Sequence, residues 1–308
     1  MKSSNIGGQA VLEGIMMRNG SKYAVAVRKP DGDIATEIDN YESFVKCEKL
    51  TKIPFVRGTF NFIDSLILGM KTLMFSASFY EDEETETVLT ADQAAKQKKK
   101  EDLIMTITMI GSVVLAMALF MVLPYFVSRL FKSVITSRFL LTVVEALVRI
   151  SLFVAYVMAI SKMKDIQRTF MYHGAEHKCI NCIEHGMELN VENVRKSSKQ
   201  HKRCGTSFLF FVMFVSIIVC FFITTESAIL RVVLRVALLP VIAGISYEII
   251  KLAGCSSNPI INLLSLPGLA MQELTTKEPT DDMIEVAIKA VEEVFDWKQY
   301  LKENFGEQ

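Results

Sequence analysis

Four blocks of mostly apolar residues interrupt this chain, and the charged residues gather between them. Each block approaches the ~20 residues that an α-helix needs to cross the hydrocarbon core of a bilayer. The pattern therefore predicts a mainly α-helical, polytopic membrane protein with about four transmembrane helices. The predicted membrane domain covers residues 103–250, and its helices cover 103–127, 139–160, 207–224 and 229–250.

Residues 59–79 form a further apolar stretch, which polar residues such as Asp64 and Lys71 interrupt. This pattern favours a helix that lies in the membrane interface or re-enters the membrane over one that spans it. In residues 80–102 an acidic run passes into a basic one. Such a run is typical of a solvated, flexible linker.

Residues 1–58 predict a small N-terminal cytoplasmic domain. An apolar run at 23–28, a Pro-Asp-Gly turn signal and a second run at 34–38 predict a β-hairpin. The glycines of segment 7–14 fit neither a phosphate loop nor a dinucleotide-binding turn. They indicate tight turns where another part of the chain approaches closely.

Residues 251–308 predict a C-terminal cytoplasmic tail with an amphipathic helix. Thr280 or Asp281 is placed to cap this helix at its N-terminus. One apolar stripe then follows, made of Met283, Val286, Ala287, Ala290, Val291, Val294 and Phe295.

The distribution of Lys and Arg predicts the orientation. Loop 161–206 carries nine of them, whereas the loop between the first two spans has only Arg129, Lys132 and Arg138. By the positive-inside rule, both termini and loop 161–206 are expected in the cytoplasm. The chain is then a multi-pass protein of the bacterial inner membrane. The lipid bilayer is then the first partner, and other membrane proteins are candidates. With 34 basic and 34 acidic residues, a nucleic-acid partner is not expected.

The six cysteines do not form a dense disulfide framework. No secretory signal opens the chain, and the first predicted span begins only near residue 103. Free or metal-binding thiols are therefore the expectation.

The sharpest chemical signal is the sequence His173-Gly174-Ala175-Glu176-His177. On a helix, positions i and i+4 share a face, so both imidazoles can reach one metal ion. The order H-x-x-E-H is that of the inverted zinc metalloproteases, in which the histidines bind zinc and the glutamate is the general base.

The same loop offers further ligands. His201 and Cys204 form an H-x-x-C pair, and Cys179 and Cys182 form a C-x-x-C pair. A catalytic zinc site, a structural zinc site and a polar domain that binds nothing all remain open, and a thiolate ligand favours the structural site.

Glu145 and Arg149 lie four residues apart within the second predicted span. Charges at that depth cost about 3 kcal/mol each on insertion scales, so they are expected to pair or to face a cavity. Arg231 and Arg235 enter the fourth span, and Glu248 lies near its end. A polar pathway and an interhelical lock are both open, and we favour the lock.

The chain resembles the DUF1385 family of bacterial membrane proteins nearly from end to end. The resemblance is carried by GGQAVLEGIMMR (7–18), AVAVRKPDG (24–32), YHGAEHK (172–178), ELNVENV (188–194), RCGTS (203–207), PGL (267–269) and LTTKEP (274–279). The family is commonly described as predicted metal-dependent enzymes. Lys202 stands where the family has proline, which leaves the proposed ligands intact. Cys179 is not a position of the family pattern, so it is left out of the ligand set.

Two hypotheses follow. In the first, the protein is a membrane-embedded metal-dependent enzyme, a hydrolase above all. A divalent metal, zinc by its donor set, is held at the cytoplasmic face by His173, His177, His201 and Cys204, and Glu176 is the base. In the second, it is a non-enzymatic membrane factor or scaffold in envelope or membrane-protein biogenesis, with a structural metal site or none. A transporter that uses Glu145 and Arg149 is a third idea, which no internal repeat supports.

Overall fold

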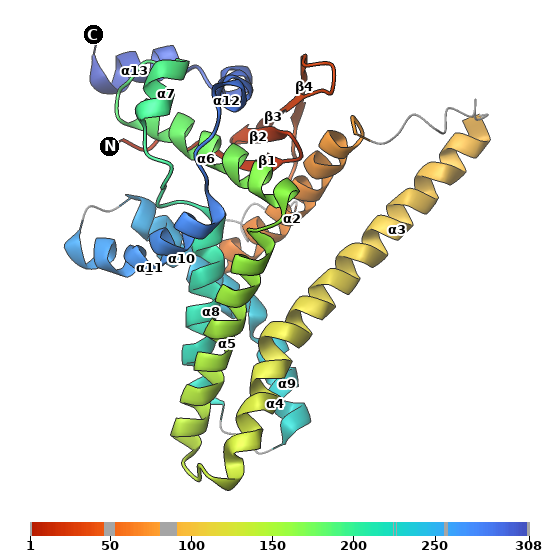
Figure 1. Cartoon of the computed structure of the whole chain (residues 1–308), viewed down its shortest axis with the longest axis vertical. Helices are drawn as coiled ribbons and strands as arrows, with labels where there is room; N and C mark the ends of the chain where they lie inside the picture. The colour runs from red at the N-terminus through yellow and green to blue at the C-terminus, as the bar shows by residue number, and fades with distance from the viewer. Residues whose placement is uncertain are drawn as a thin grey trace. The chain divides into compact units, whose positions relative to one another are not determined.

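The computed structural model describes residues 2–45, 53–80, 91–223, 225, 227–255 and 258–306. These residues form a mainly helical protein with one small antiparallel β-sheet (Figure 1). The chain divides into two compact units. The first comprises Met1–Tyr80, Val157–Ser216 and Leu239–Gln308, and the second comprises Glu81–Tyr156 and Ile217–Leu238.

The sheet of the first unit has four strands in the order β1-β2-β3-β4. They are β1 (Gly7–Val11), β2 (Gly14–Asn19), β3 (Lys22–Arg28) and β4 (Ile34–Asn40). The predicted hairpin is confirmed as β3 and β4. The glycine-rich segment, expected as tight turns, instead forms β1 and the start of β2, joined by a turn in which Glu13 has a positive φ of 50°.

Two glycines of this segment sit where other atoms approach closely. A Cβ at Gly8 would lie 2.6 Å from the Met16 carbonyl oxygen, and one at Gly14 would lie 2.3 Å from that of Ala26. Neither space accepts a side chain, so the expectation of a close approach is confirmed although the conformation is extended.

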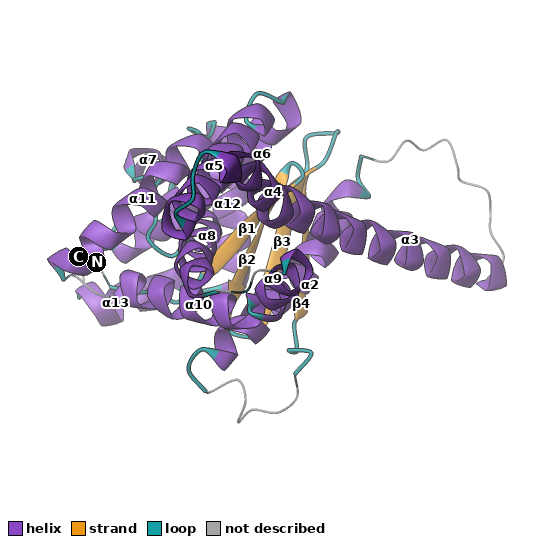
Figure 2. Cartoon of the chain, turned by 90° about the horizontal axis from the view of Figure 1, so that it is seen from below, coloured by secondary structure: helices purple, strands orange, loops and turns teal. Residues whose placement is uncertain are grey.

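Helices cover both faces of the central strands β2 and β3, whereas most of β4 is exposed (Figure 2). Side chains on β2 and β3 alternate between two cores, as period-2 strands require. One core includes α6 (Lys164–Glu184) and α12 (Asp281–Val294), and the other includes Leu68 of α2 (Val56–Ala77). The first core takes Ile15, Met17, Ala24 and Ala26 of the sheet, and the second takes Met16, Tyr23, Val25 and Val27.

Helix α2 occupies the stretch expected as an interfacial or re-entrant helix. It buries polar side chains, and the Asp64 carboxylate accepts a hydrogen bond of 3.0 Å from the Tyr41 hydroxyl. Apolar side chains such as Leu66 and Leu73 are exposed. This distribution is the reverse of that on a helix of a water-soluble domain.

The C-terminal amphipathic helix is confirmed as α12. Its stripe from Met283 to Val294 is buried, and Thr280 is the N-cap residue, without a side-chain hydrogen bond. The helix packs on β2, β3 and α6, so these C-terminal residues belong to the first unit. The short helices α7 (Val191–Lys196) and α13 (Trp297–Phe305) complete this region, which includes the buried Trp297.

Among the described residues, three helices are long and apolar enough to cross a membrane, and a bent pair would make a fourth if it counts as one span. The first runs over Lys99–Ser133, from within α3 (Ala91–Met117) through η2 (Ala118–Val122), α4 (Leu123–Leu130) and η3 (Phe131–Ser133). The others are α5 (Arg138–Ile160) and α8 (Gly205–Phe222). The helix α11 (Pro259–Thr275) follows the bent pair.

The bent pair consists of α9 (Ala228–Ala237) and α10 (Leu239–Cys255), which meet at 43°. The bend falls beside Pro240, which lacks the N–H for a helical hydrogen bond and clashes with the preceding turn. The linker expected at 80–102 is instead helical from Ala91, where α3 begins. Residues 81–90 of that segment lie outside the described residues.

The expected pairing of Glu145 is confirmed. Within the second unit, its carboxylate accepts a hydrogen bond of 2.9 Å from Arg149 of the same helix. Arg235 of α9 also donates to it and lies 2.7 Å from Oε1. One buried carboxylate thus joins α5 to α9, as the lock interpretation expects.

Candidate metal centre

The H-x-x-E-H motif lies on the buried half of α6. The rings of His173 and His177 are one helical turn apart, with centroids 4.4 Å from each other. Between them, a Cβ at Gly174 would lie 2.0 Å from the carbonyl oxygen of Lys277. The segment that follows α11 therefore crosses α6 at the motif itself.

Cys204 joins the two histidines from the buried turn immediately before α8. Its Sγ lies 3.2 Å from His173 Nε2. One ligand atom from each of His173, His177 and Cys204 can be chosen so that all three lie within 4.8 Å of one another. The structure thus brings together three of the four residues expected to bind metal.

Backbone carbonyls hold both imidazoles in place. His173 Nδ1 lies 2.9 Å from the Thr275 oxygen, and His177 Nδ1 lies 2.7 Å from the Lys199 oxygen. A carbonyl only accepts, so each Nδ1 carries the hydrogen, and in the neutral ring Nε2 keeps its lone pair. Metal-bound histidines are oriented in this way, so the donor set fits a metal ion.

Electrostatics favour the thiolate form of Cys204. Burial alone would raise the pKa of this thiol, but the imidazoles of His173 and His177 hold it well below its usual value. Burial lowers the pKa of His173, yet the Cys204 charge and its hydrogen bond raise it to about 9. The thiolate is the form that binds metals, and a bound metal ion would displace the histidine proton.

Glu176 lies beside this cluster and is buried. Burial raises the pKa of its carboxyl, against the opposing effects of His173 and His177. The backbone N–H of Gly8 donates to the carboxylate, and a Cβ at Gly8 would lie 3.0 Å from the Glu176 Cδ atom. Strand β1 therefore positions the predicted base.

His201 lies next to the cluster but bonds elsewhere. Its ring centroid is 5.9 Å from that of His177, and its Nε2 lies 3.3 Å from a Glu184 carboxylate oxygen. The Gln272 side chain makes two hydrogen bonds to the backbone of His201. It accepts from the His201 N–H at 2.9 Å and donates to the His201 carbonyl at 2.8 Å. Metal binding by His201 stays a prediction.

The C-x-x-C pair and the fourth histidine, His185, are not members of this cluster. Cys179 and Cys182 belong to the hydrophobic core of the first unit. His185 is exposed, with Nδ1 2.7 Å from the Asn181 carbonyl oxygen. Among the described cysteines, these two, Cys204 and Cys220 are free, as expected.

Sequence reasoning missed three parts of the site. The Thr275 and Lys199 carbonyls carry no signal, because every residue supplies one. Gly8 was visible as one of two adjacent glycines, but its partner Glu176 was not.

Fold and site together define a mainly helical protein that has three to four helices apolar enough to span a membrane and a buried His/Cys cluster. The chain belongs to the DUF1385 family, described as "Protein of unknown function (DUF1385)", whose model matches residues 53–297. It is 36% identical over 301 residues to "Uncharacterized protein YqhQ" of Bacillus subtilis (strain 168). The alignment covers 97% of this chain and 94% of that protein. The expected family is confirmed, and no solved structure matches significantly.

Proposed function

We propose that the chain is a membrane-embedded metal-dependent enzyme, a hydrolase above all. The observation that carries the proposal is the convergence of His173, His177 and Cys204, with the Glu176 carboxylate buried beside them. These three residues would hold the ion, and Glu176 would take up a proton from the attacking water.

The donor set supports zinc. Two imidazoles and one thiolate are ligands that zinc accepts readily. Catalytic zinc sites have three protein ligands and one open position, whereas structural sites have four. The bond between His201 and Glu184 favours the three-ligand form. A zinc ion here would act as a Lewis acid toward water or a substrate carbonyl.

The apolar helices support a membrane location. The most apolar window of the Lys99–Ser133 helix has a mean hydropathy of 2.4, and none of it is buried within the protein. Such a surface requires lipid or a protein partner. From the Lys and Arg distribution, we place the cluster at the cytoplasmic face of a bacterial inner membrane.

A second candidate function needs no metal. The 3.2 Å contact between Cys204 Sγ and His173 Nε2 is that of a nucleophile and its base, and the Thr275 carbonyl would orient the imidazole. The chain would then be a cysteine-dependent acyl-transfer enzyme. A scaffold with a structural metal is the non-enzymatic alternative.

Elemental analysis of the purified full-length protein tests the proposal. We expect about one zinc per chain in the wild type, loss of zinc in His173→Ala and Cys204→Ser, and retention in Glu176→Gln, which keeps the three ligands. His185→Ala is the matched control, because that imidazole is exposed and outside the cluster.

The outcomes separate the alternatives. Metal-free wild type whose Cys204 is alkylated selectively by iodoacetamide would favour the cysteine enzyme. Zinc in the wild type, together with full complementation of a gene-deletion strain by Glu176→Gln, would favour the scaffold. If Glu176→Gln keeps its zinc but no longer complements a strain that lacks the gene, the metal-dependent enzyme is supported.

A further inference from the structure

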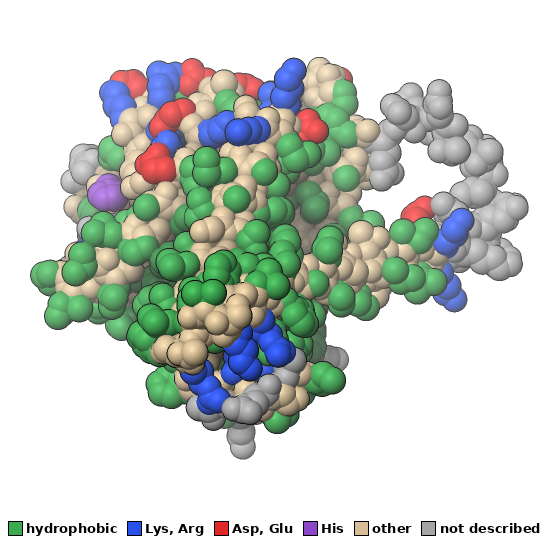
Figure 3. Space-filling view, turned by 60° about the horizontal axis from the view of Figure 1, so that its bottom comes forward, with side chains coloured by type: hydrophobic (Ala, Val, Ile, Leu, Met, Phe, Trp, Pro, Cys, Tyr) green, Lys and Arg blue, Asp and Glu red, His purple; other side chains and the backbone are tan. Residues whose placement is uncertain are grey.

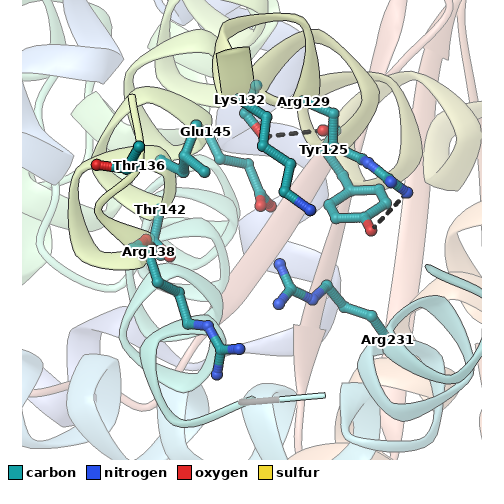
Figure 4. A pocket seen from close by; sticks show the side chains of 10 residues that line it. Tyr125, Arg129, Lys132, Thr136, Arg138, Thr142, Glu145 and Arg231 are labelled. Carbon is teal, nitrogen blue, oxygen red and sulfur yellow. Dashed lines mark hydrogen bonds between the residues drawn. The ribbon is translucent and has the colours of Figure 1, made fainter. Parts of the chain in front are cut away.

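A cavity of about 220 Å³ lies in the second unit, between the end of α4, the start of α5 and α9 (Figure 4). Its size is below the ~300–1,000 Å³ of pockets for drug-sized ligands, so it suits a small group. Among the described residues that line it, Glu145 is the only carboxylate. Four lining residues are cationic: Arg129, Lys132, Arg138 and Arg231.

Three guanidinium groups beside this cavity contact the ring of the buried Tyr125. The guanidinium carbons of Arg129, Arg231 and Arg235 lie 5.8, 5.2 and 5.3 Å from its centroid. Each contact attracts a cation to the ring face by about 0.5–2 kcal/mol. The ring carries no net charge, however, so the mutual repulsion of three like charges is not cancelled.

The carboxylate of Glu145 is already bound by other groups. Arg149 and Arg235 both donate to it from the buried side. Arg129 bonds to the Tyr125 hydroxyl and Arg231 to the Thr225 carbonyl, which are both neutral acceptors. The buried Arg231 Nε has no hydrogen-bond partner in the described part of the chain. Among the described residues that line the cavity, cationic side chains therefore outnumber carboxylates, and Arg231 keeps one unused buried donor.

The surroundings of the cavity are apolar. Leu130 and Val134, which flank Lys132 in sequence, are 77% and 82% exposed. Figure 3, which brings this end of the helices forward, shows Lys and Arg side chains gathered within a mostly hydrophobic surface. A cationic pocket bordered by apolar side chains matches an amphiphile with an anionic headgroup.

We propose that this cavity binds a phosphate group, carried by an anionic lipid headgroup or free in solution. Arg and Lys are the side chains that proteins use for phosphate, through charge-assisted hydrogen bonds. Figure 4 shows the Lys132 and Arg231 side chains directed toward the space between Glu145 and Tyr125, where a phosphate would meet both. This proposal is independent of the metal centre.

The test uses the full-length protein, delipidated and then placed in nanodiscs of phosphatidylcholine with or without phosphatidylglycerol. Lipid retained after extraction is measured by native mass spectrometry, and inorganic phosphate is titrated separately. We expect wild type to retain phosphatidylglycerol, and Lys132→Gln/Arg231→Gln to lose roughly tenfold or more in affinity. Lys99→Gln/Lys100→Gln, which removes two exposed charges from α3, is the matched control and should bind as wild type.

Competition distinguishes the two sources of phosphate. Displacement of phosphatidylglycerol by millimolar inorganic phosphate, or binding of inorganic phosphate alone, supports the site with a free anion as ligand. Retention of the lipid without competition supports a headgroup site, provided that the double variant shows the expected loss of affinity. Equal binding by wild type and the double variant, or no binding of either probe, overturns the proposal.

Two further variants guard against misreading. Lys132→Arg/Arg231→Lys keeps both charges and should retain binding, so a loss in the glutamine variants is not a folding defect if this variant binds. Glu226 lies outside the described residues and comes five positions before Arg231 in sequence, so the variant Glu226→Gln is tested as well. Binding by wild type and Glu226→Gln alike supports the site, whereas binding by Glu226→Gln alone overturns it for the native chain.

Discussion

His173 Nε2 lies 3.2 Å from Cys204 Sγ, although 31 residues separate the two in sequence. The contact places a thiol against an imidazole whose other nitrogen is held by a backbone carbonyl. It makes the site a compact three-residue cluster and leaves His201, three residues before Cys204, bonded to Glu184.

His201 should therefore be dispensable for metal binding. We expect His201→Ala to keep the zinc that Cys204→Ser loses, and to lower the free energy of unfolding by about 1–3 kcal/mol because Glu184 loses a buried partner. Zinc content and detergent-phase unfolding of the two variants give the comparison. Loss of zinc from His201→Ala at unchanged stability would restore the four-ligand site.

Gly8 should tolerate no side chain. In Gly8→Ala the new Cβ would meet the Met16 carbonyl and the Glu176 carboxylate, which we expect to cost about 1–3 kcal/mol of stability. Gly7→Ala is the matched control, because nothing lies within 4 Å of a Cβ there. Thermal unfolding of both variants decides the point, and equal melting temperatures would contradict it.

The Glu145 carboxylate should be energetically coupled to Arg235. Glu145→Gln leaves buried arginines without their counter-charge and should cost ~3–5 kcal/mol. The double variant Glu145→Gln/Arg235→Gln should cost less than the sum of the single changes. Unfolding of all three variants in detergent completes the cycle, and strict additivity would show that the pair does not interact.

Acid should destabilise the first unit through Glu184. Burial raises the pKa of this carboxyl, but the His201 bond, the Ser4 N–H and the Arg203 charge lower it to about 2. Because the folded pKa lies below the unfolded value of about 4.3, the carboxylate stabilises the fold above that pH. The contribution is lost as the pH falls from about 4.3 toward 2. As the pH is lowered from 6 to 2.5, the free energy of unfolding should fall less steeply in Glu184→Gln than in the wild type.

We predict the topology from the Lys and Arg distribution. Alkaline phosphatase fusions after residue 135 should be active, and fusions after residues 185 and 308 should be inactive, since phosphatase needs the external compartment. Green fluorescent protein fusions at the same points should give the opposite pattern. An active phosphatase at residue 185 would place the His/Cys cluster outside the cytoplasm.

Local patterns were enough to predict much of this protein. Long apolar blocks predict helices that can span a membrane, because only a helix satisfies its own backbone over that length in an apolar medium. The i, i+4 spacing of His173 and His177 brings their rings together within one helix. The stripe from Met283 to Val294 likewise predicted the buried face of α12.

Only the tertiary structure decided which distant segments meet. The contacts from Cys204, Thr275 and Gly8 to α6 depend on packing across the first unit, and no periodicity encodes them. The same packing buries both faces of the central strands β2 and β3 and makes strands of the glycine-rich segment, which was expected to form turns. It also turns His201 toward Glu184. Short-range spacing determines neighbours within one element, whereas neighbours between elements are set by the packing of the whole core.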